Sequence, residues 1–294
     1  MNKTNNRRAL GMFIASMLIF GTIGVFRRYI PLPSAFLAFV RGIVGGLFLL
    51  GFIRLRGKGA SRQLPRPLLL RLSVTGAMIG FNWMLLFEAY NHTTVATATL
   101  CYYMQPTIVI LLSPIVFQER LTGKKAFCAL ISIVGMVLIS GVADTGGARG
   151  QDMPGILLGL GAAALYAGVV MMNKKIQGVD AYQRTTVQLL AAGIVMVPYL
   201  LLTDGFSGIE FTPASLLLLL AVGILHTGLA YALYFGSMER LPLQSIAVLS
   251  YIDPVCAVLF SALLLRESLS PLQAVGAVLI LGSALAAERR PAGR

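Results

Sequence analysis

Ten apolar stretches alternate with short polar connections along the chain. Each is a continuous run, such as "SLLLLLAVGIL", and lacks the period-two alternation of a half-buried strand. Each is also about as long as a helix must be to cross roughly 30 Å of hydrocarbon. The pattern predicts an all-α membrane protein of ten transmembrane helices, over residues 9–26, 34–53, 68–90, 93–117, 124–142, 153–173, 182–202, 214–237, 242–265 and 271–287.

The composition agrees with this pattern, because 57% of the residues are hydrophobic and only 12% are charged. A soluble chain of this length cannot bury so much apolar surface. Cys101, Cys128 and Cys256 lie inside apolar stretches without paired spacing, so we expect small apolar fillers and neither a disulfide nor a metal site. The first apolar stretch continues as a full span, so we expect a retained helix and not a cleaved signal peptide.

The basic residues lie mostly on alternate connections, and this distribution accounts for the net charge of +13. Few of them, namely Arg27, Arg28, Arg149 and Arg266, fall on the opposite connections. This is the positive-inside bias, so we expect a multi-pass protein of the plasma (bacterial inner) membrane with cytoplasmic N- and C-termini. No block mixes basic residues with exposed aromatics, so the lipid bilayer and not a nucleic acid is the expected partner.

An internal repeat appears when the chain is displaced by 148 positions against itself. The stretch "YMQPTIVILLSPIVFQERLTG" at 103–123 then lies over "YIDPVCAVLFSALLLRESLSP" at 251–271. The chain is therefore predicted to consist of two five-helix repeats, residues 1–147 and 148–294. The identical residue types are Tyr103, Pro106, Ser113, Glu119 and Leu121 in the first copy, and Tyr251, Pro254, Ser261, Glu267 and Leu269 in the second.

An odd number of spans in each repeat means that the second copy enters the membrane from the opposite side. Inverted repeats recur in transporters, which place the substrate site near the midplane between the halves. Pro106 and Pro254 fall near mid-depth, where a proline frees a backbone carbonyl and bends its helix. A membrane tolerates this only where protein or a watery cavity satisfies the freed group, so we expect both kinks to line one central cavity.

The two copies resemble the drug/metabolite transporter superfamily in its EamA-type ten-helix exporter form. The resemblance rests on a proline followed by a glutamate at a helix end, "PTIVILLSPIVFQE" and "PVCAVLFSALLLRE", and on the five-plus-five layout of the whole chain. It implies that spans one to four and six to nine surround a central cavity, that spans five and ten are outer supports, and that transport is export. The sequence is most similar to the aromatic amino acid exporters, on overall similarity and an aromatic-rich middle.

Arg41 and Asp253 are charged residues deep inside predicted spans. A charge at such depth costs several kcal/mol unless it faces water or a partner. Arg41 therefore either receives a substrate carboxylate or forms a structural pair with Glu88 or Asp253. Asp253 either binds a substrate ammonium, titrates as a proton site, or caps backbone donors beside Pro254.

Other residues suit a site of few polar groups against aromatic walls. His226, in the eighth span, either hydrogen-bonds the solute, couples a proton or joins two helices. Glu88 is expected at a water-exposed rim, and Glu119 and Glu267 are expected to be structural. The candidate substrate-binding residues are Arg41, Asn82, Trp83, Thr99, Tyr102, Tyr103, Gln105, Tyr166, His226, Tyr231, Tyr251 and Asp253, with Pro106 and Pro254 as helix kinks.

A secondary transporter explains these features better than other membrane functions. The sequence has no HExxH, GxSxG, Walker-type loop or cysteine–histidine metal spacing, so we expect no enzyme activity, cofactor, metal or direct use of ATP. A channel would normally need a ring of filter residues from a symmetric oligomer. We expect export of small amphipathic metabolites, amino acids and especially aromatic ones, by alternating access, with or without proton coupling. Alternative solutes are cationic drugs, other metabolites, and sugars or nucleotides. A nucleotide or sugar nucleotide is disfavoured, because its phosphates would need several cationic residues in the cavity and Arg41 is the single deep cation.

Overall fold

The computed structural model contains only helices as regular structure in the residues that it describes, which are 3–55, 64–118, 121–139, 152–203, 205–207, 209, 211–238, 241 and 249–288. Seven helical segments between Arg7 and Met238 are long and apolar enough to cross a membrane. The apolar helices Ile252–Leu264 and Pro271–Ala287 are shorter. The predicted all-α membrane fold is confirmed.

Six of the predicted spans are uninterrupted helices. In lipid only a helix satisfies its own backbone hydrogen bonds, so these continuous runs of leucine, valine, isoleucine and alanine form helices. Polar residues at their ends supply caps, as where the Asp180 carboxylate accepts hydrogen bonds from the backbone of Tyr182 and Gln183. The helices are α3 (Ser34–Leu55), α4 (Arg66–His92), α7 (Gly123–Ile139), α8 (Met153–Lys174), α9 (Ala181–Leu202) and α14 (Pro271–Glu288).

Three of the other spans are interrupted. The first divides at Thr22 into α1 (Lys3–Gly21) and α2 (Ile23–Arg28). The fourth divides into α5 (Val95–Tyr102) and α6 (Gln105–Phe117). The eighth is α10 (Pro213–Ala221), the π-helix η1 (Val222–Leu229) and α11 (Ala230–Met238). In the predicted ninth span the structure describes α13 (Ile252–Leu264), and residues 242–248 lie outside the described part.

Both predicted kink prolines stand at the start of a helix and not in its middle. Pro106 is in the first turn of α6, after a turn at Tyr103 and Met104, and Pro254 is in the first turn of α13. The missing N–H of proline costs little there, because the first helical N–H groups have no partner within the helix. Pro106 thus marks the break between α5 and α6, and Pro254 marks the start of α13.

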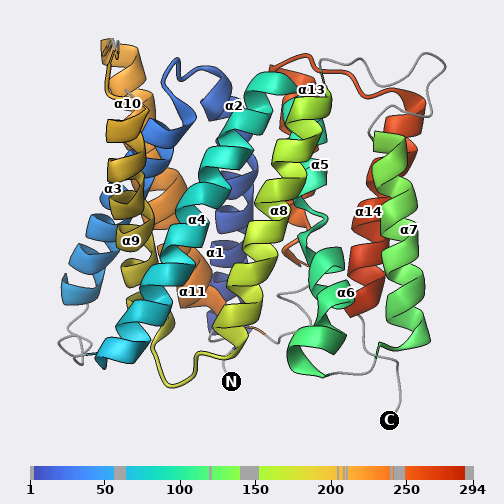
Figure 1. The fold of residues 1–294 in the computed structure, drawn as a ribbon, viewed down its shortest axis with the longest axis horizontal. Coiled ribbons are helices and arrows are strands. Elements are labelled where there is room, and N and C mark those ends of the chain that lie inside the picture. The colour runs from blue at the N-terminus through green and yellow to red at the C-terminus, as the bar shows by residue number, and fades with distance from the viewer. Residues whose placement is uncertain are drawn as a thin grey trace.

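The helix packing follows an inverted two-fold pattern. α1 rises from the side of the two termini and α8 descends towards it, so these corresponding helices run in opposite directions (Figure 1). Corresponding helices also pair with each other, α3 with α9 and α7 with α14, and α5 of the fourth span packs against α13 of the ninth. The contact of α4 with α8 has its counterpart in that of α11 with α1. The predicted inverted-repeat arrangement of helices therefore agrees with the packing.

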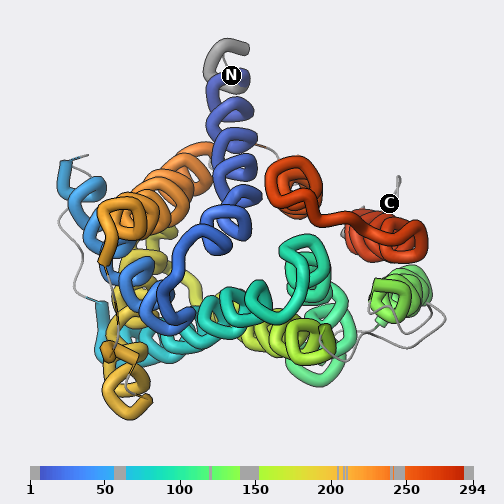
Figure 2. Tube along the Cα trace, turned by 90° about the horizontal axis from the view of Figure 1, so that it is seen from above, coloured from blue at the N-terminus to red at the C-terminus, as the bar shows by residue number. Residues whose placement is uncertain are grey.

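α7 and α14 form a pair at one end of the molecule, beside the helices that enclose the centre (Figures 1 and 2). Their axes approach closely at Gly135 and Gly276, and the Ser132 hydroxyl lies 2.6 Å from that of Ser283. The placement is the one that the resemblance implied for spans five and ten. The other spans surround the cavity, and α7 and α14 reach its lining only near their ends, at Lys124, Lys125, Ala284 and Ala287.

Candidate functional site

A cavity of about 1060 Å³ lies between the central helices. On the side of the termini its lining reaches helix ends, with Lys124 and Lys125 of α7, Arg184 of α9 and Met238 of α11. Ten of the candidates named from the sequence line it: Arg41, Trp83, Thr99, Tyr102, Tyr103, Gln105, Pro106, Tyr166, Tyr231 and Asp253.

Arg41 lies about two turns into α3 and is buried, with 6% of its surface exposed. Its guanidinium carbon stands 4.0 Å from the centre of the Trp83 ring, and its Nε donates a 2.8 Å hydrogen bond to the Thr227 hydroxyl. No ion pair joins it to Glu88 or Asp253, the structural partners considered for it. The aromatic face and the hydroxyl thus hold a buried cation beside the cavity.

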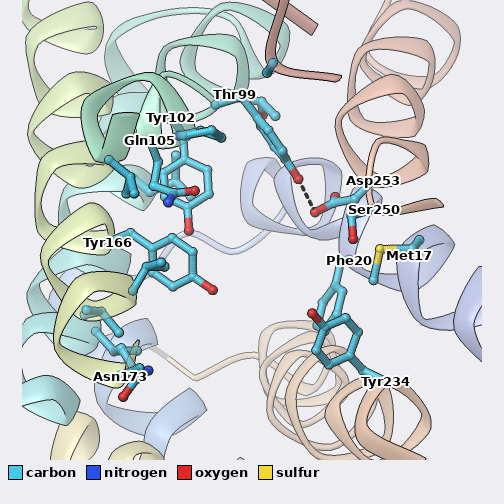
Figure 3. A pocket seen from close by; sticks show the side chains of 18 of the residues that line it. Met17, Phe20, Thr99, Tyr102, Gln105, Tyr166, Asn173, Tyr234, Ser250 and Asp253 are labelled. Carbon is cyan, nitrogen blue, oxygen red and sulfur yellow. Dashed lines mark hydrogen bonds between the residues drawn. The ribbon is translucent and has the colours of Figure 1, made fainter. Parts of the chain in front are cut away.

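Asp253 lies in the first turn of α13 and faces the cavity (Figure 3). Its carboxylate accepts a 2.6 Å hydrogen bond from the Tyr103 hydroxyl, which comes from the turn between α5 and α6. Among the described residues this phenol, and not a backbone amide, is its hydrogen-bond partner. Each repeat has a tyrosine three residues before the proline and a polar residue directly before it, "YMQP" at 103–106 and "YIDP" at 251–254. Tyr103 belongs to the first of these stretches and Asp253 to the second, so the contact links the two repeats across the site.

Aromatic side chains form two opposing walls of the cavity. Tyr102 and Tyr166 lie on one side, with ring centres 5.7 Å apart, and Phe20 and Tyr234 lie on the other (Figure 3). Phe20 contacts the Tyr231 ring edge-to-face, with centres 5.2 Å apart. Aromatic rings arranged in this way present apolar faces together with a few hydroxyl groups. The cavity walls are therefore mainly apolar ring faces with a few hydroxyl groups.

Four candidates are absent from the cavity lining. Asn82 donates a 2.5 Å hydrogen bond to the carbonyl of Ala162 and so joins α4 to α8. His226 Nε2 lies 2.8 Å from the Thr22 hydroxyl, which is the helix-to-helix hydrogen bond considered as one alternative for this histidine. Tyr251 is half-buried and Pro254 is buried. Asn82 and His226 thus join helices around the site.

Several lining residues were not among the candidates. Phe20, Tyr90 and Phe235 are aromatic residues of apolar spans, and nothing in the sequence marks them out from lipid-facing ones. Gln188 is different, since an amide inside an apolar span is a visible signal. Its side-chain nitrogen donates to the Thr75 hydroxyl at 2.7 Å and to Asn173 Oδ1 at 2.8 Å, which ties α4, α8 and α9 together at the termini end of the cavity.

Glu88 and Glu267 lie away from the cavity lining. Glu88 is 39% exposed and pairs with His92 at 3.2 Å, in accordance with a rim position. Glu267 forms a 2.9 Å ion pair with Arg28, and Glu119 lies outside the described residues. No cluster that could hold a metal occurs in the described part of the chain, and all three cysteines there are free thiols.

Comparison with known proteins identifies the family. The model of the "EamA-like transporter family" matches residues 7–141 and again residues 153–287. An "Uncharacterized transporter YxxF" of Bacillus subtilis (strain 168) is 29% identical over 94% of this chain and 88% of its own. A "Probable amino-acid metabolite efflux pump" of Escherichia coli (strain K12) is 29% identical over 76% of each chain.

A solved crystal structure has the same fold, with a TM-score of 0.66 over 98% of this chain and 97% of that chain at 22% sequence identity. The helical fold thus agrees with that of a solved structure. Since the two matches to the family model together cover most of the sequence, the chain belongs to the EamA-like transporter family, and it is an integral membrane protein.

Proposed function

We propose that this chain exports small amphipathic metabolites, above all amino acids with aromatic side chains, by alternating access. The observation that carries the proposal is Arg41, a buried cation that borders the cavity and forms no ion pair with a described residue. An uncompensated charge at membrane depth is costly. A carboxylate on the solute is the natural partner, because it accepts paired hydrogen bonds from a guanidinium.

The rest of the lining supports a zwitterionic solute with a ring. Asp253 offers a carboxylate to an ammonium group, and the faces of Tyr102, Tyr166 and Tyr231 offer apolar contact and cation–π attraction. The name of the Escherichia coli relative, a probable amino-acid metabolite efflux pump, is in line with this solute class. Asp253 is also our candidate for proton coupling, since it is an acidic group in the cavity lining.

Export of cationic drugs is the second candidate function. Asp253 and the tyrosine rings could receive an organic cation without any contribution from Arg41. The two candidates therefore differ in one residue: an amino acid needs Arg41, and a cation without a carboxylate does not.

Orientation belongs to the same proposal. We assign the side of the termini to the cytoplasm of a bacterial inner membrane, since α7, α8 and α9 carry Lys124, Lys125, Lys174 and Arg184 at that side. In this orientation the present cavity is reached from the cytoplasm. We further assign the functional halves to residues 1–147 and 148–294, with the boundary outside the described residues.

The decisive experiment is counterflow in liposomes that contain the purified protein, with labelled phenylalanine, tryptophan and phenethylamine, with and without a pH gradient. We expect saturable counterflow of the amino acids. Arg41→Gln should weaken their apparent affinity about ten- to hundredfold, because a hydrogen bond to a charged group contributes about 1.5–3 kcal/mol. Counterflow of phenethylamine should hardly change. Transport of the amine alone would favour the cationic-drug function, and equal losses for both solutes would make Arg41 structural.

A further inference from the structure

Thr227 contacts Arg41 from the π-helix η1. Its hydroxyl accepts the 2.8 Å hydrogen bond from Arg41 Nε and donates a 3.0 Å bond to the carbonyl of Val222. A hydroxyl has one hydrogen, and here Val222 receives it, so a lone pair remains directed at the guanidinium. Thr227 is completely buried and cannot turn to water instead. The hydroxyl is thus a fixed acceptor.

The π-helical backbone provides this arrangement. Thr227 donates to the carbonyl five residues earlier, which is the spacing of a π-helix. The preceding residue, His226, bonds to Thr22 at the break between α1 and α2. Two consecutive residues of η1 thus tie the first and second spans to the eighth. Short π segments in α-helices are frequently found at functional sites.

We propose that Thr227 is a positioning residue for solute binding, and this rests on the proposed function in which Arg41 receives a carboxylate. Nε of Arg41 is occupied by Thr227, and Trp83 covers the guanidinium at 4.0 Å. The two terminal nitrogens form no hydrogen bond with a described residue. They are the pair of parallel donors that a carboxylate accepts, and Thr227 fixes the direction in which they point.

The test compares Thr227→Val, which keeps the branched shape but removes the acceptor, with Thr227→Ser, which keeps the acceptor. In counterflow, Thr227→Val should raise the half-saturating concentration of phenylalanine about tenfold and change its maximal rate little. The half-saturating concentration and the maximal rate of phenethylamine should not change. Thr227→Ser should restore the affinity for phenylalanine. A purely structural role would change both solutes alike.

The outcomes separate this inference from the proposed function. If Arg41→Gln weakens phenylalanine counterflow and Thr227→Val does not, Thr227 has no positioning role and the proposed function stands. If Arg41→Gln leaves phenylalanine counterflow unchanged, the proposed function itself fails. Equal losses of both solutes in Thr227→Val, or no rescue by Thr227→Ser, would also overturn the positioning role.

A second, independent observation concerns the side opposite the termini. There the outermost lining residues of the cavity are Gly24, Tyr90 and Thr99, and the ends of α2 and α13 lie beyond them. After α13 the chain turns at Arg266, which has a left-handed φ of 56°. This turn brings Glu267 back, and its backbone N–H donates to the carbonyl of Ser261 at 3.3 Å.

The Glu267 carboxylate then receives three hydrogen bonds. The donors are Arg28 at 2.9 Å, the backbone N–H of Val95 at 2.8 Å and the Ser261 hydroxyl at 2.5 Å. Arg28 also donates to the Thr93 carbonyl at 2.8 Å. The Val95 N–H is one of the first amides of α5, which have no partner within their own helix. We call Arg28, Val95, Ser261 and Glu267 the outer cluster.

The outer cluster connects the two repeats. Ser261 and Glu267 come from the second repeat, and Arg28 and Val95 come from the first. The Glu267 side chain is only 13% exposed, so these bonds are less screened than those of an ordinary surface pair. A link of this kind resists any movement that separates the outer ends of α13, α2 and α5.

We infer that the outer cluster is a gate, which holds the cavity closed on the side opposite the termini and breaks when the cavity opens there. Glu88 provides a matched control on the same side. It accepts hydrogen bonds from Ser34 at 2.6 Å and Asn91 at 3.0 Å, and both partners belong to its own repeat. Neutralising Glu88 removes the same charge without breaking a link between repeats.

The test measures access to the cavity lining from that side. A cysteine at Ile23, in a chain whose three native cysteines are replaced by alanine, is labelled with an impermeant maleimide. Glu267→Gln and Arg28→Gln should each raise the labelling rate about tenfold, the shift expected from losing one charge-assisted hydrogen bond. Glu88→Gln should leave it unchanged. The inference is wrong if Glu267→Gln and Arg28→Gln both keep the wild-type labelling rate, or if Glu88→Gln raises the labelling rate as much as they do.

Discussion

At the scale of single residues, Asp253 is the acidic group placed to couple a proton to transport. It borders the cavity, and Tyr103 holds its carboxylate at 2.6 Å. Asp253→Asn keeps the size of the side chain and an acceptor for Tyr103, but it cannot titrate. We therefore expect this variant to lose any dependence of transport on a pH gradient and to retain counterflow, which needs no net proton movement.

The measurement is phenylalanine transport into liposomes with and without an imposed pH gradient, for a wild-type protein that responds to it. Asp180→Asn is the control, because Asp180 caps α9 and is absent from the cavity lining. It should keep the response of the wild type. A response to the gradient that survives in Asp253→Asn would exclude this carboxylate as the coupling group and leave Glu88 and His226 to be tested.

The same scale shows what the sequence can reveal of the site. Arg41 and Asp253 are recognisable because a charge in an apolar run is costly unless the fold gives it a cavity or a partner. Phe20 is not recognisable, because an aromatic ring is equally at home in lipid and in a cavity wall. Asn82 and His226 are polar, yet they bond to other helices, and the sequence does not show which side of a helix they occupy.

At the scale of helices, α3 and α9 pack with their backbones almost in contact. A Cβ atom at Gly42 would lie 2.5 Å from the backbone nitrogen of Gly193 and 2.7 Å from the carbonyl of Leu189. Neither group can move without moving α9. Gly42→Ala should therefore destabilise the protein by about 1–3 kcal/mol, the usual cost of overpacking.

Thermal unfolding in detergent, followed by the fraction of protein that stays monodisperse, measures this effect. Gly51→Ala is the matched control in the same helix, because nothing lies within 4 Å of a Cβ atom there. Alanine is also the better helix former, so the control should unfold at the wild-type temperature or above it. Equal unfolding temperatures of Gly42→Ala and Gly51→Ala would mean that α3 and α9 separate easily.

The places of the described spans along the chain could be predicted from the sequence, because hydrophobic length alone specifies a span. Their interruptions could be predicted only in part. Pro106 marked the break between α5 and α6, and Pro254 marked the start of α13, although we expected a bend within a helix at each proline. The break at Thr22 and the π segment at Val222–Leu229 have no comparable signal, since they depend on packing between spans.

At the scale of the whole molecule, the repeat relates the outer cluster to the opposite end of the protein. Arg266 and Gln118 are the described non-glycine residues with a left-handed φ, both of 56°, and they are repeat mates. Ser261 likewise corresponds to Ser113, whose hydroxyl here donates to Ile110 of its own helix at 3.0 Å. Inverted repeats exchange conformations during transport, so the second copy of the cluster should form when the first one breaks.

In the first spans of the two repeats the displacement is 147 positions, so Gly21 corresponds to Gly168 and Arg28 corresponds to Lys175. Glu119, which corresponds to Glu267, lies outside the described residues. We expect Lys175→Gln to destabilise the conformation in which the cavity is open on the side opposite the termini. Glu267→Gln should have the reverse effect and favour that conformation. Combining the two changes should therefore bring the maleimide labelling of a cysteine at Ile23 back towards the wild-type rate. Lys124→Gln, a basic residue on the same side, is the control and should not reverse the effect of Glu267→Gln. If Lys175→Gln instead raises the labelling rate further, the two ends of the molecule are not alternating copies of one gate.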